Sequence, residues 1–130
     1  MVWEMGEDMA PVSVNLVDTA GVIKKSKLDQ DVDRWSMMRT MRAISRAQVA
    51  ILVVDGSQSF SPMDAQIANM VLDKGRSLVL AVNKWDAVPD DGWSGNRAYS
   101  KDEYADWVAD RFPELKKWVP VVYTSASEGK

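Results

Sequence analysis

Three polar residues, Asn83, Lys84 and Asp86, follow directly after an apolar run that ends at Val82. A carboxylate at such a position can accept two hydrogen bonds at once, and guanine is the common base that presents two adjacent N–H donors, at N1 and N2. Adenine lacks that pair of donors. The sequence therefore predicts a guanine-binding loop at the carboxyl end of a buried strand, with Asp86 as its base-reading group.

A second loop of this kind lies earlier in the chain. Val14–Val17 is a short apolar run with the pattern of a strand, and it leads into Asp18, Thr19, Ala20 and Gly21. This D-x-x-G spacing is typical of loops that sense a terminal phosphate and its magnesium ion. The sequence thus predicts a phosphate- and magnesium-sensing loop before the guanine-binding loop.

A third loop, Ser125 and Ala126, follows another strand-like run at residues 119–124. Each single residue also has a purely structural interpretation. Asp18 could cap a helix, Asp86 could be a turn residue, and Asn83 could be an amide that braces its loop. Three such loops in this order, each after an apolar strand, favour the nucleotide-binding interpretation.

The three loops together resemble the later half of a GTPase domain of the Ras-like, translation-factor-related superclass. The resemblance narrows to the second GTPase domain of the Der (EngA) family through Asp18–Gly21 and the following Val22–Lys27, then Trp35-Ser36, residues 39–47 and the Trp-containing loop 83–86. It covers residues 15–130, and residues 1–14 stay unassigned. Der proteins carry two GTPase domains and a KH-like domain and act in assembly of the large ribosomal subunit.

For the base, this resemblance implies a site of five residues: Asn83, Lys84, Asp86, Ser125 and Ala126. Asp86 would hold guanine N1 and N2, and Asn83 would brace the loop and face the base near N7. The Lys84 stem would lie against the ring plane, and the backbone N–H of Ala126 would meet guanine O6.

For the phosphates, the resemblance implies that Asp18 orients Mg²⁺ through a water and that the Gly21 N–H bonds the terminal phosphate of GTP. Many GTPases have a Gln directly after this Gly, where it orients the attacking water. Here the residue is Val22, which has no polar side-chain group. No residue is therefore assigned as catalytic.

The sequence has no G-x-x-x-x-G-K-[ST] motif. In GTPases this loop cradles the phosphates with its backbone N–H groups, reaches the terminal phosphates with its Lys and binds magnesium with its Ser or Thr. We therefore expect a G domain that is truncated at both ends, with weak or no binding of GTP and impaired hydrolysis.

Composition excludes several other kinds of site. The 130 residues suit one domain, with 46% hydrophobic and 27% charged residues. There is no Cys and no His, so Cys-based zinc sites, disulfides and His acid–base catalysis are excluded. No apolar stretch approaches the ~20 residues that span a bilayer. Localisation stays open between the bacterial cytoplasm and a plastid stroma.

Positive charge gathers directly after the D-x-x-G box. Residues 23–46 hold seven basic side chains against three acidic ones, a local net charge of +4, although the whole chain has −3. This stretch could contact ribosomal RNA, or it could be an ordinary solvated helix face. The candidate RNA contacts are Lys24, Lys25, Lys27, Arg39 and Arg42.

The pattern of apolar residues predicts alternating strands and helices. A helix capped by Asp31 or Asp33 should run to about Arg46, and its inward stripe would be Trp35, Met38, Met41 and Ile44. Residues 50–54 have the continuous apolar pattern of a strand buried on both faces. Asp55-Gly56 is interpreted as the turn that ends this strand rather than as a metal ligand, and the six Trp residues as packing residues.

A second helix should begin with Ser61 as N-cap and Pro62 at its first position, and end at Gly75. Its buried face would carry Ile67, Met70 and Val71. Residues 78–82 form the next strand, residues 88–100 a polar loop and residues 100–111 a third helix. This alternation predicts an α/β fold, doubly wound around a mainly parallel sheet of the P-loop GTPase type.

Three classes of function follow. The first is a piece of a ribosome-assembly GTPase that binds GTP or GDP with Mg²⁺. The second is a non-catalytic RNA- or ribosome-binding module that keeps the GTPase fold. The third is an unrelated doubly wound domain, such as a flavodoxin-like or receiver module, but we find neither the acidic cluster nor the flavin loop that it requires.

Overall fold

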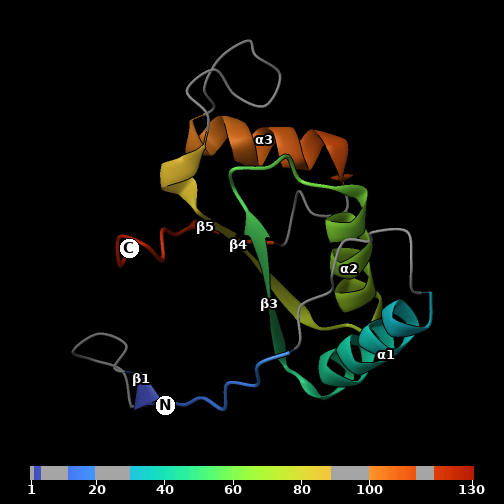
Figure 1. The fold of residues 1–130 in the computed structure, drawn as a ribbon. Coiled ribbons are helices and arrows are strands. Elements are labelled where there is room, and N and C mark those ends of the chain that lie inside the picture. Colours follow the sequence, from blue (N-terminus) through green and yellow to red (C-terminus); the bar gives the residue numbers. More distant parts are fainter. Residues whose placement is uncertain (1, 4–11, 20–29, 89–99, 114–118) are drawn as a thin grey trace. The chain divides into compact units, whose positions relative to one another are not determined.

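The computed structural model describes residues 2–3, 12–19, 30–88, 100–113 and 119–130 (Figure 1). It divides into two compact units, residues 1–43 and residues 44–130, and each is described by itself. No helix among the described residues has the length and apolar character needed to cross a membrane.

The first unit contains a small antiparallel sheet. Strand β1 (Val2–Trp3) pairs with strand β2 (Val12–Ser13), with Val2 opposite Ser13 and Trp3 opposite Val12. The predicted strand at Val14–Val17 is wrong, because residues 14–19 have no regular secondary structure. Leu16 and Val17 are each 68% exposed. An apolar run becomes a strand only where a neighbouring strand pairs with it, and the ladder with β1 ends at Ser13.

Helix α1 (Gln30–Arg46) ends where the sequence predicts. It begins earlier than expected, so Asp31 and Asp33 lie inside its first turns rather than before them. The predicted inward stripe is only partly confirmed, since Ile44 is buried while Met38 and Met41 are 46% and 42% exposed. Periodicity shows which face of a helix is apolar, but it does not show whether another element covers that face.

The second unit is built on a parallel sheet in the order β3-β4-β5. Its strands are β3 (Val49–Asp55), β4 (Ser77–Asn83) and β5 (Val121–Tyr123). The register pairs Asp55 with Asn83, the last residues of β3 and β4, and it pairs Val82 with Tyr123, where β5 ends. The loops that follow the three strands therefore begin at one edge of the sheet.

Helix α2 (Pro62–Asp73) has the predicted start and end. The Ser61 side chain accepts the Asp64 N–H at 3.3 Å, and the Asp64 carboxylate accepts the Ser61 N–H at 2.8 Å, which makes a capping box. Gly75 follows the helix with φ of +63° and donates its N–H to Leu72 O. Of the predicted buried face, Val71 is buried, while Ile67 and Met70 are half-buried; Ala65 and Ala68 are buried as well.

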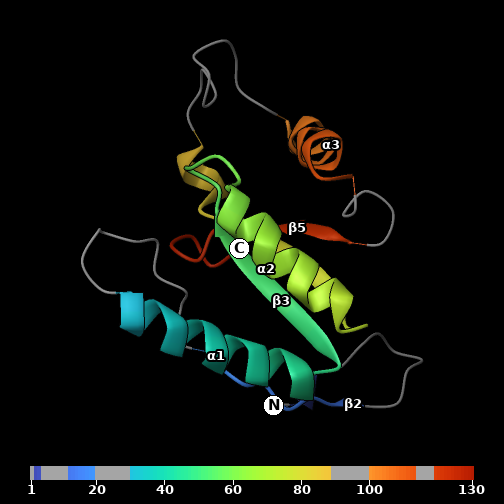
Figure 2. The ribbon, with the colours of Figure 1, turned by 90° about the vertical axis from the view of Figure 1, so that its right-hand side faces the viewer.

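Helix α3 (Lys101–Arg111) is capped in the same way by Ser100 and Glu103. Helix α2 lies alongside β3 in Figures 1 and 2. Both helices pack on the face of the sheet that carries Leu80 and Val82. The core of buried residues is Ile44, Val54, Phe60, Ala65, Ala68, Val71, Leu78, Leu80, Val82, Tyr104 and Val108.

The opposite face of β3 is exposed. Val49, Ile51 and Val53 alternate with the core residues of the strand and are 53%, 57% and 61% exposed. The prediction that this strand is buried on both faces is therefore wrong. Its continuous apolar pattern is typical of a central strand, but among the described residues β3 is at the edge of its sheet.

Removing the cap of α2 tests how much this helix end contributes to stability. We expect Ser61→Ala to lower the free energy of unfolding by about 1 kcal/mol, because the Asp64 N–H loses its acceptor. Urea denaturation followed by circular dichroism measures the change. Ser59→Ala, two residues away in the same loop, is the matched control and should leave the midpoint unchanged; an equal loss in both variants would contradict a capping role.

Candidate functional site

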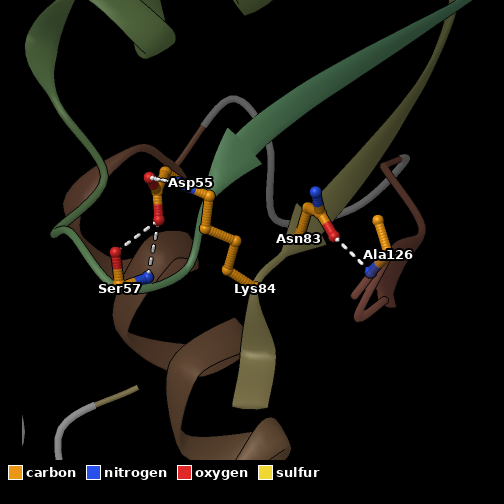
Figure 3. A network of polar contacts seen from close by, with 5 residues as sticks. All are labelled: Asp55, Ser57, Asn83, Lys84 and Ala126. Atoms are coloured by element: carbon orange, nitrogen blue, oxygen red, sulfur yellow. Dashed lines mark hydrogen bonds and ion pairs between the residues drawn. The ribbon is translucent and has the colours of Figure 1, made fainter. Parts of the chain in front are cut away.

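Asn83 joins the two loops of the predicted base site, the loop after β4 and the loop after β5. It is the last residue of β4, and its side-chain Oδ1 accepts hydrogen bonds from the Ala126 N–H at 3.1 Å and from Thr124 Oγ1 at 3.2 Å (Figure 3). One amide oxygen therefore holds two consecutive loops together. The Ala126 N–H, for which the family resemblance implies a contact with guanine O6, donates to Asn83 in this structure.

Trp85 fixes the base loop by both its backbone and its ring. It begins the short 3₁₀ helix η1 (Trp85–Ala87), and its backbone N–H donates to Thr124 O at 3.1 Å. Its ring meets the ring of Tyr123 edge-on at 4.5 Å between centroids and the ring of Tyr104 at 5.6 Å. Such edge-to-face contacts stabilise the packing of aromatic clusters. Trp85 thus holds the loop against α3.

Asp86 lies exposed at the surface of this braced loop. Its Oδ2 accepts from Ser127 Oγ at 3.3 Å. The pKa of the Asp86 carboxyl lies below its ordinary value, chiefly because the Ser125 side chain hydrogen-bonds to it, with smaller contributions from its own backbone, Ser127 and the charge of Lys130. Asp86 is therefore ionised at neutral pH and can act only as an acceptor.

The third loop is closed on itself. The Ser125 N–H donates to Lys130 O at 2.7 Å, and the Lys130 N–H donates back to Ser125 O at 3.0 Å. Ser125 is 5% exposed, and its hydroxyl lies 3.1 Å from that of Ser127. This closed turn holds both hydroxyls near the Asp86 carboxylate. Four of the five predicted base-site residues, Asn83, Asp86, Ser125 and Ala126, are thus connected through these two loops.

The fifth, Lys84, has a partner that the sequence analysis missed. Its Nζ lies 2.7 Å from Asp55 Oδ2, at the end of β3 (Figure 3). The other carboxylate oxygen, Oδ1, accepts from the Ser57 N–H at 3.0 Å and from Ser57 Oγ at 2.5 Å. These bonds, that of Lys84 first, lower the pKa of Asp55 below its ordinary value. The sequence places Asp55 and Asn83 directly after the predicted strands 50–54 and 78–82, at one edge of a parallel sheet, but it does not identify Lys84 as the partner of Asp55.

Gly56 brings the turn after β3 against the base loop. Its N–H donates to Asn83 O at 2.6 Å, and a Cβ at this position would lie 2.9 Å from that same oxygen and 3.1 Å from Val82 Cγ1. Real Cβ atoms essentially never come within 3.0 Å of a backbone atom. Only glycine therefore fits between the two loops without displacing one of them.

The predicted phosphate-sensing residues are described only in part. Asp18 and Thr19 lie in the first unit and are exposed, whereas Ala20 and Gly21 lie outside the described residues. Among the candidate RNA contacts, Arg39 and Arg42 are exposed on α1. The others, Lys24, Lys25 and Lys27, lie outside the described residues.

The described part of the chain contains no group of three or more His, Cys, Asp or Glu side chains that could hold a metal. Asp18 brings one exposed carboxylate, whereas Mg²⁺ needs near-octahedral oxygen coordination. The described residues therefore do not make a magnesium site by themselves, and no chemical step is assigned to the metal.

The contact at Gly56 predicts a strong effect of one methyl group. We expect Gly56→Ala to lower the free energy of unfolding by about 1–3 kcal/mol, because the new Cβ forces the Asn83 backbone away. It should also move the Ala126 amide resonance in a ¹H–¹⁵N spectrum, since Asn83 holds that N–H. Gly75→Ala is the control for glycine replacement; it should destabilise through its positive φ but leave the Ala126 resonance in place.

Comparison with known proteins agrees with this geometry. Residues 4–84 match the family described as 50S ribosome-binding GTPase. A GTPase Der from Caldicellulosiruptor saccharolyticus is 36% identical over 118 residues, which are 91% of this chain and 25% of that protein. A GTPase Der from Azoarcus is 49% identical over 75 residues, 58% of this chain and 17% of that protein. The chain thus spans about a quarter or less of these relatives' lengths.

Solved structures show the same fold. Era from Aquifex aeolicus bound to GDP.AlF4- superposes with a TM-score of 0.60 over 86% of this chain and 34% of that one, at 20% identity. A probable GTP-binding protein EngB superposes with a TM-score of 0.59 over 85% of this chain and 66% of that one, also at 20% identity. Together with the family match, the parallel sheet and the loops at its edge, these likenesses show that the chain belongs to the 50S ribosome-binding GTPase family, as part of a Der-like G domain with the α/β fold of P-loop GTPases.

Proposed function

We propose that this chain is a partial G domain, residues 1–130 with residues 1–14 unassigned, which binds the base of guanine nucleotides. The observation that carries the proposal is Asp86, an exposed and ionised carboxylate on a loop whose backbone is fixed by its neighbours. An ionised carboxylate has lone pairs on both oxygens and can accept hydrogen bonds from guanine N1 and N2 together. The family membership supports the same ligand.

The residues proposed for the remaining base contacts lie in the loops at the same edge of the sheet. Ala126 is exposed, and its N–H would meet guanine O6 by sharing its proton with Asn83 Oδ1 in a three-centre bond. A donor at this place accepts the carbonyl of guanine and disfavours the amino group of adenine. The stem of Lys84 would lie along the plane of the base.

Binding of the phosphates should be weak in this chain. The sequence contains no G-x-x-x-x-G-K-[ST] motif, whose backbone N–H groups and Lys supply the phosphate contacts in this class. Asp18 and Gly21 remain the proposed partners of Mg²⁺ and the terminal phosphate. Because Val22 cannot orient a water, we propose that hydrolysis by this chain alone is impaired or absent.

Isothermal titration with GTP and Mg²⁺ tests the phosphate side of the proposal. We expect no heat of binding at micromolar protein and nucleotide, and GDP and guanosine should bind about as weakly as GTP, because the base supplies most of the contacts. A submicromolar affinity for GTP would contradict this expectation.

Replacing the Asp86 carboxylate with an amide tests the proposed contacts to the guanine base. Asp86→Asn should weaken guanosine binding about tenfold or more, because the amide has only one acceptor oxygen and its NH₂ group opposes guanine N2. The same variant should gain binding of xanthosine, which has a carbonyl oxygen in place of the N2 amino group. NMR titration of the whole chain with each nucleoside measures both changes.

Asp110→Asn on α3 is the matched control, since it makes the same change of charge at an exposed position. It should bind guanosine as the unmodified chain does. If Asp86→Asn bound guanosine unchanged, or gained nothing for xanthosine, Asp86 would not be the base-reading group.

A second candidate function is binding of ribosomal RNA, in assembly of the large ribosomal subunit. Arg39 and Arg42 are exposed on α1 within the basic stretch 23–46, and exposed cations of this kind bind phosphate backbones. The family description points to the same partner. A non-catalytic module would bind RNA independently of GTP, with an affinity that falls steeply as salt rises. The compartment that we propose is the bacterial cytoplasm or a plastid stroma.

A further inference from the structure

We propose that Asp55 is a positioning residue of the guanine-binding loop and that it acts through Lys84. The inference deepens the proposed function and rests on it, because it concerns how the loop is held ready for the base. Asp55 lies on a different strand from the loop and 29 positions before Lys84, and nothing in the base-site motif itself includes it.

The pair is oriented from both sides. Ser57 donates its N–H and its hydroxyl to Asp55 Oδ1, which leaves Oδ2 directed to Lys84 Nζ at 2.7 Å. The side chain of Asp55 is 28% exposed, so the carboxylate is held largely inside the turn, while that of Lys84 is 58% exposed. A carboxylate fixed in this way presents the lysine with one preferred position, whereas a mobile surface partner would not.

Lys84 needs such a partner because of its backbone. It has φ of 59° and ψ of 37°, and it is the one residue other than glycine with a positive φ in the described part of the chain. The left-handed region is unfavourable for residues with a Cβ and persists where surrounding contacts hold it. No side-chain hydrogen bond caps η1, which begins directly after Lys84. Backbone hydrogen bonds at Lys84 O and at its neighbours hold this conformation, and the ion pair with Asp55 adds a side-chain contact to them.

The left-handed backbone at Lys84 lies between the two parts of the loop that contact the loop after β5. Asn83 before it is bound to Ala126, and Asp86 after it lies near Ser127. The Gly56 N–H, one residue after Asp55, is bound to Asn83 O at 2.6 Å. The turn after β3 therefore contacts the base loop twice, through Gly56 on the backbone and through Asp55 on the Lys84 side chain, and Figure 3 shows both strand ends side by side. Asp55 is placed to hold the Lys84 stem where a base would stack.

A double-mutant cycle on the whole chain tests this coupling. Guanosine affinity is measured by ¹H–¹⁵N NMR titration for the unmodified chain, Asp55→Asn, Lys84→Met and the double variant. We expect Asp55→Asn to weaken binding about threefold, in the range of an oriented surface ion pair. The loss should be absent in the chain that already carries Lys84→Met, because the two residues act together. Asp73→Asn, an exposed aspartate on α2, is the charge-matched control and should change nothing.

The backbone of Lys84 gives a readout that needs no ligand. The three-bond coupling between the amide and α protons and the ¹³Cα shift of Lys84 report its left-handed conformation. Both should move toward averaged values in Asp55→Asn, while the core methyl resonances of Val71 and Val82 stay in place. Ser57→Ala should move them in the same direction by less, since it releases only the far side of the carboxylate.

The outcomes separate the two proposals. If Asp55→Asn weakened binding equally in the unmodified chain and in the Lys84→Met variant, or left both the Lys84 coupling and the affinity unchanged, the positioning role of Asp55 would be overturned while the proposed base binding stood. If the unmodified chain showed no shift with guanosine, the proposed function would fail. The Lys84 coupling would then still show whether Asp55 holds this backbone.

Discussion

The candidate site depends on the register of one parallel ladder. Asp55 lies opposite Asn83, and Val82 lies opposite Tyr123, so β3, β4 and β5 end together. Parallel strands carry their following loops at the same edge, and a shift by one residue would also turn every core side chain to the other face. The bonds from the Ala126 N–H to Asn83 Oδ1 and from the Gly56 N–H to Asn83 O are possible because the strands stop in line.

The ladder is held in this register by a core on one face. Leu78, Leu80 and Val82 of β4 are all at most 3% exposed and meet side chains from α2 and α3. Trp85 extends this core into the base loop through its contacts with Tyr104 and Tyr123. The burial of Tyr123 raises its pKa to about 12, so its hydroxyl stays protonated and donates to Lys101 O. The loop is therefore positioned by packing as well as by hydrogen bonds.

The face of β3 opposite the core is not covered by any of the described residues. Ile51 and Val53 are more than half exposed on a strand whose composition suits a central position. Exposed apolar edges of this kind favour association with other chains.

Local signals in the sequence determined the elements whose causes are local. The cap at Ser61 and the end of α2 at Gly75 depend on hydrogen bonds within a few residues, and both were predicted. The strand β4 was predicted from its continuous apolar run, although its pairing partners lie far along the chain. The motif Asn83–Asp86 marks the loop after β4, which is the proposed guanine-binding loop. Only the tertiary structure decided the exposure of Met38 and Ile51, the missing strand at Val14–Val17 and the pairing of Lys84 with Asp55. Each of these depends on which distant segment lies beside the residue, and a pattern read along one chain contains no information on that neighbour.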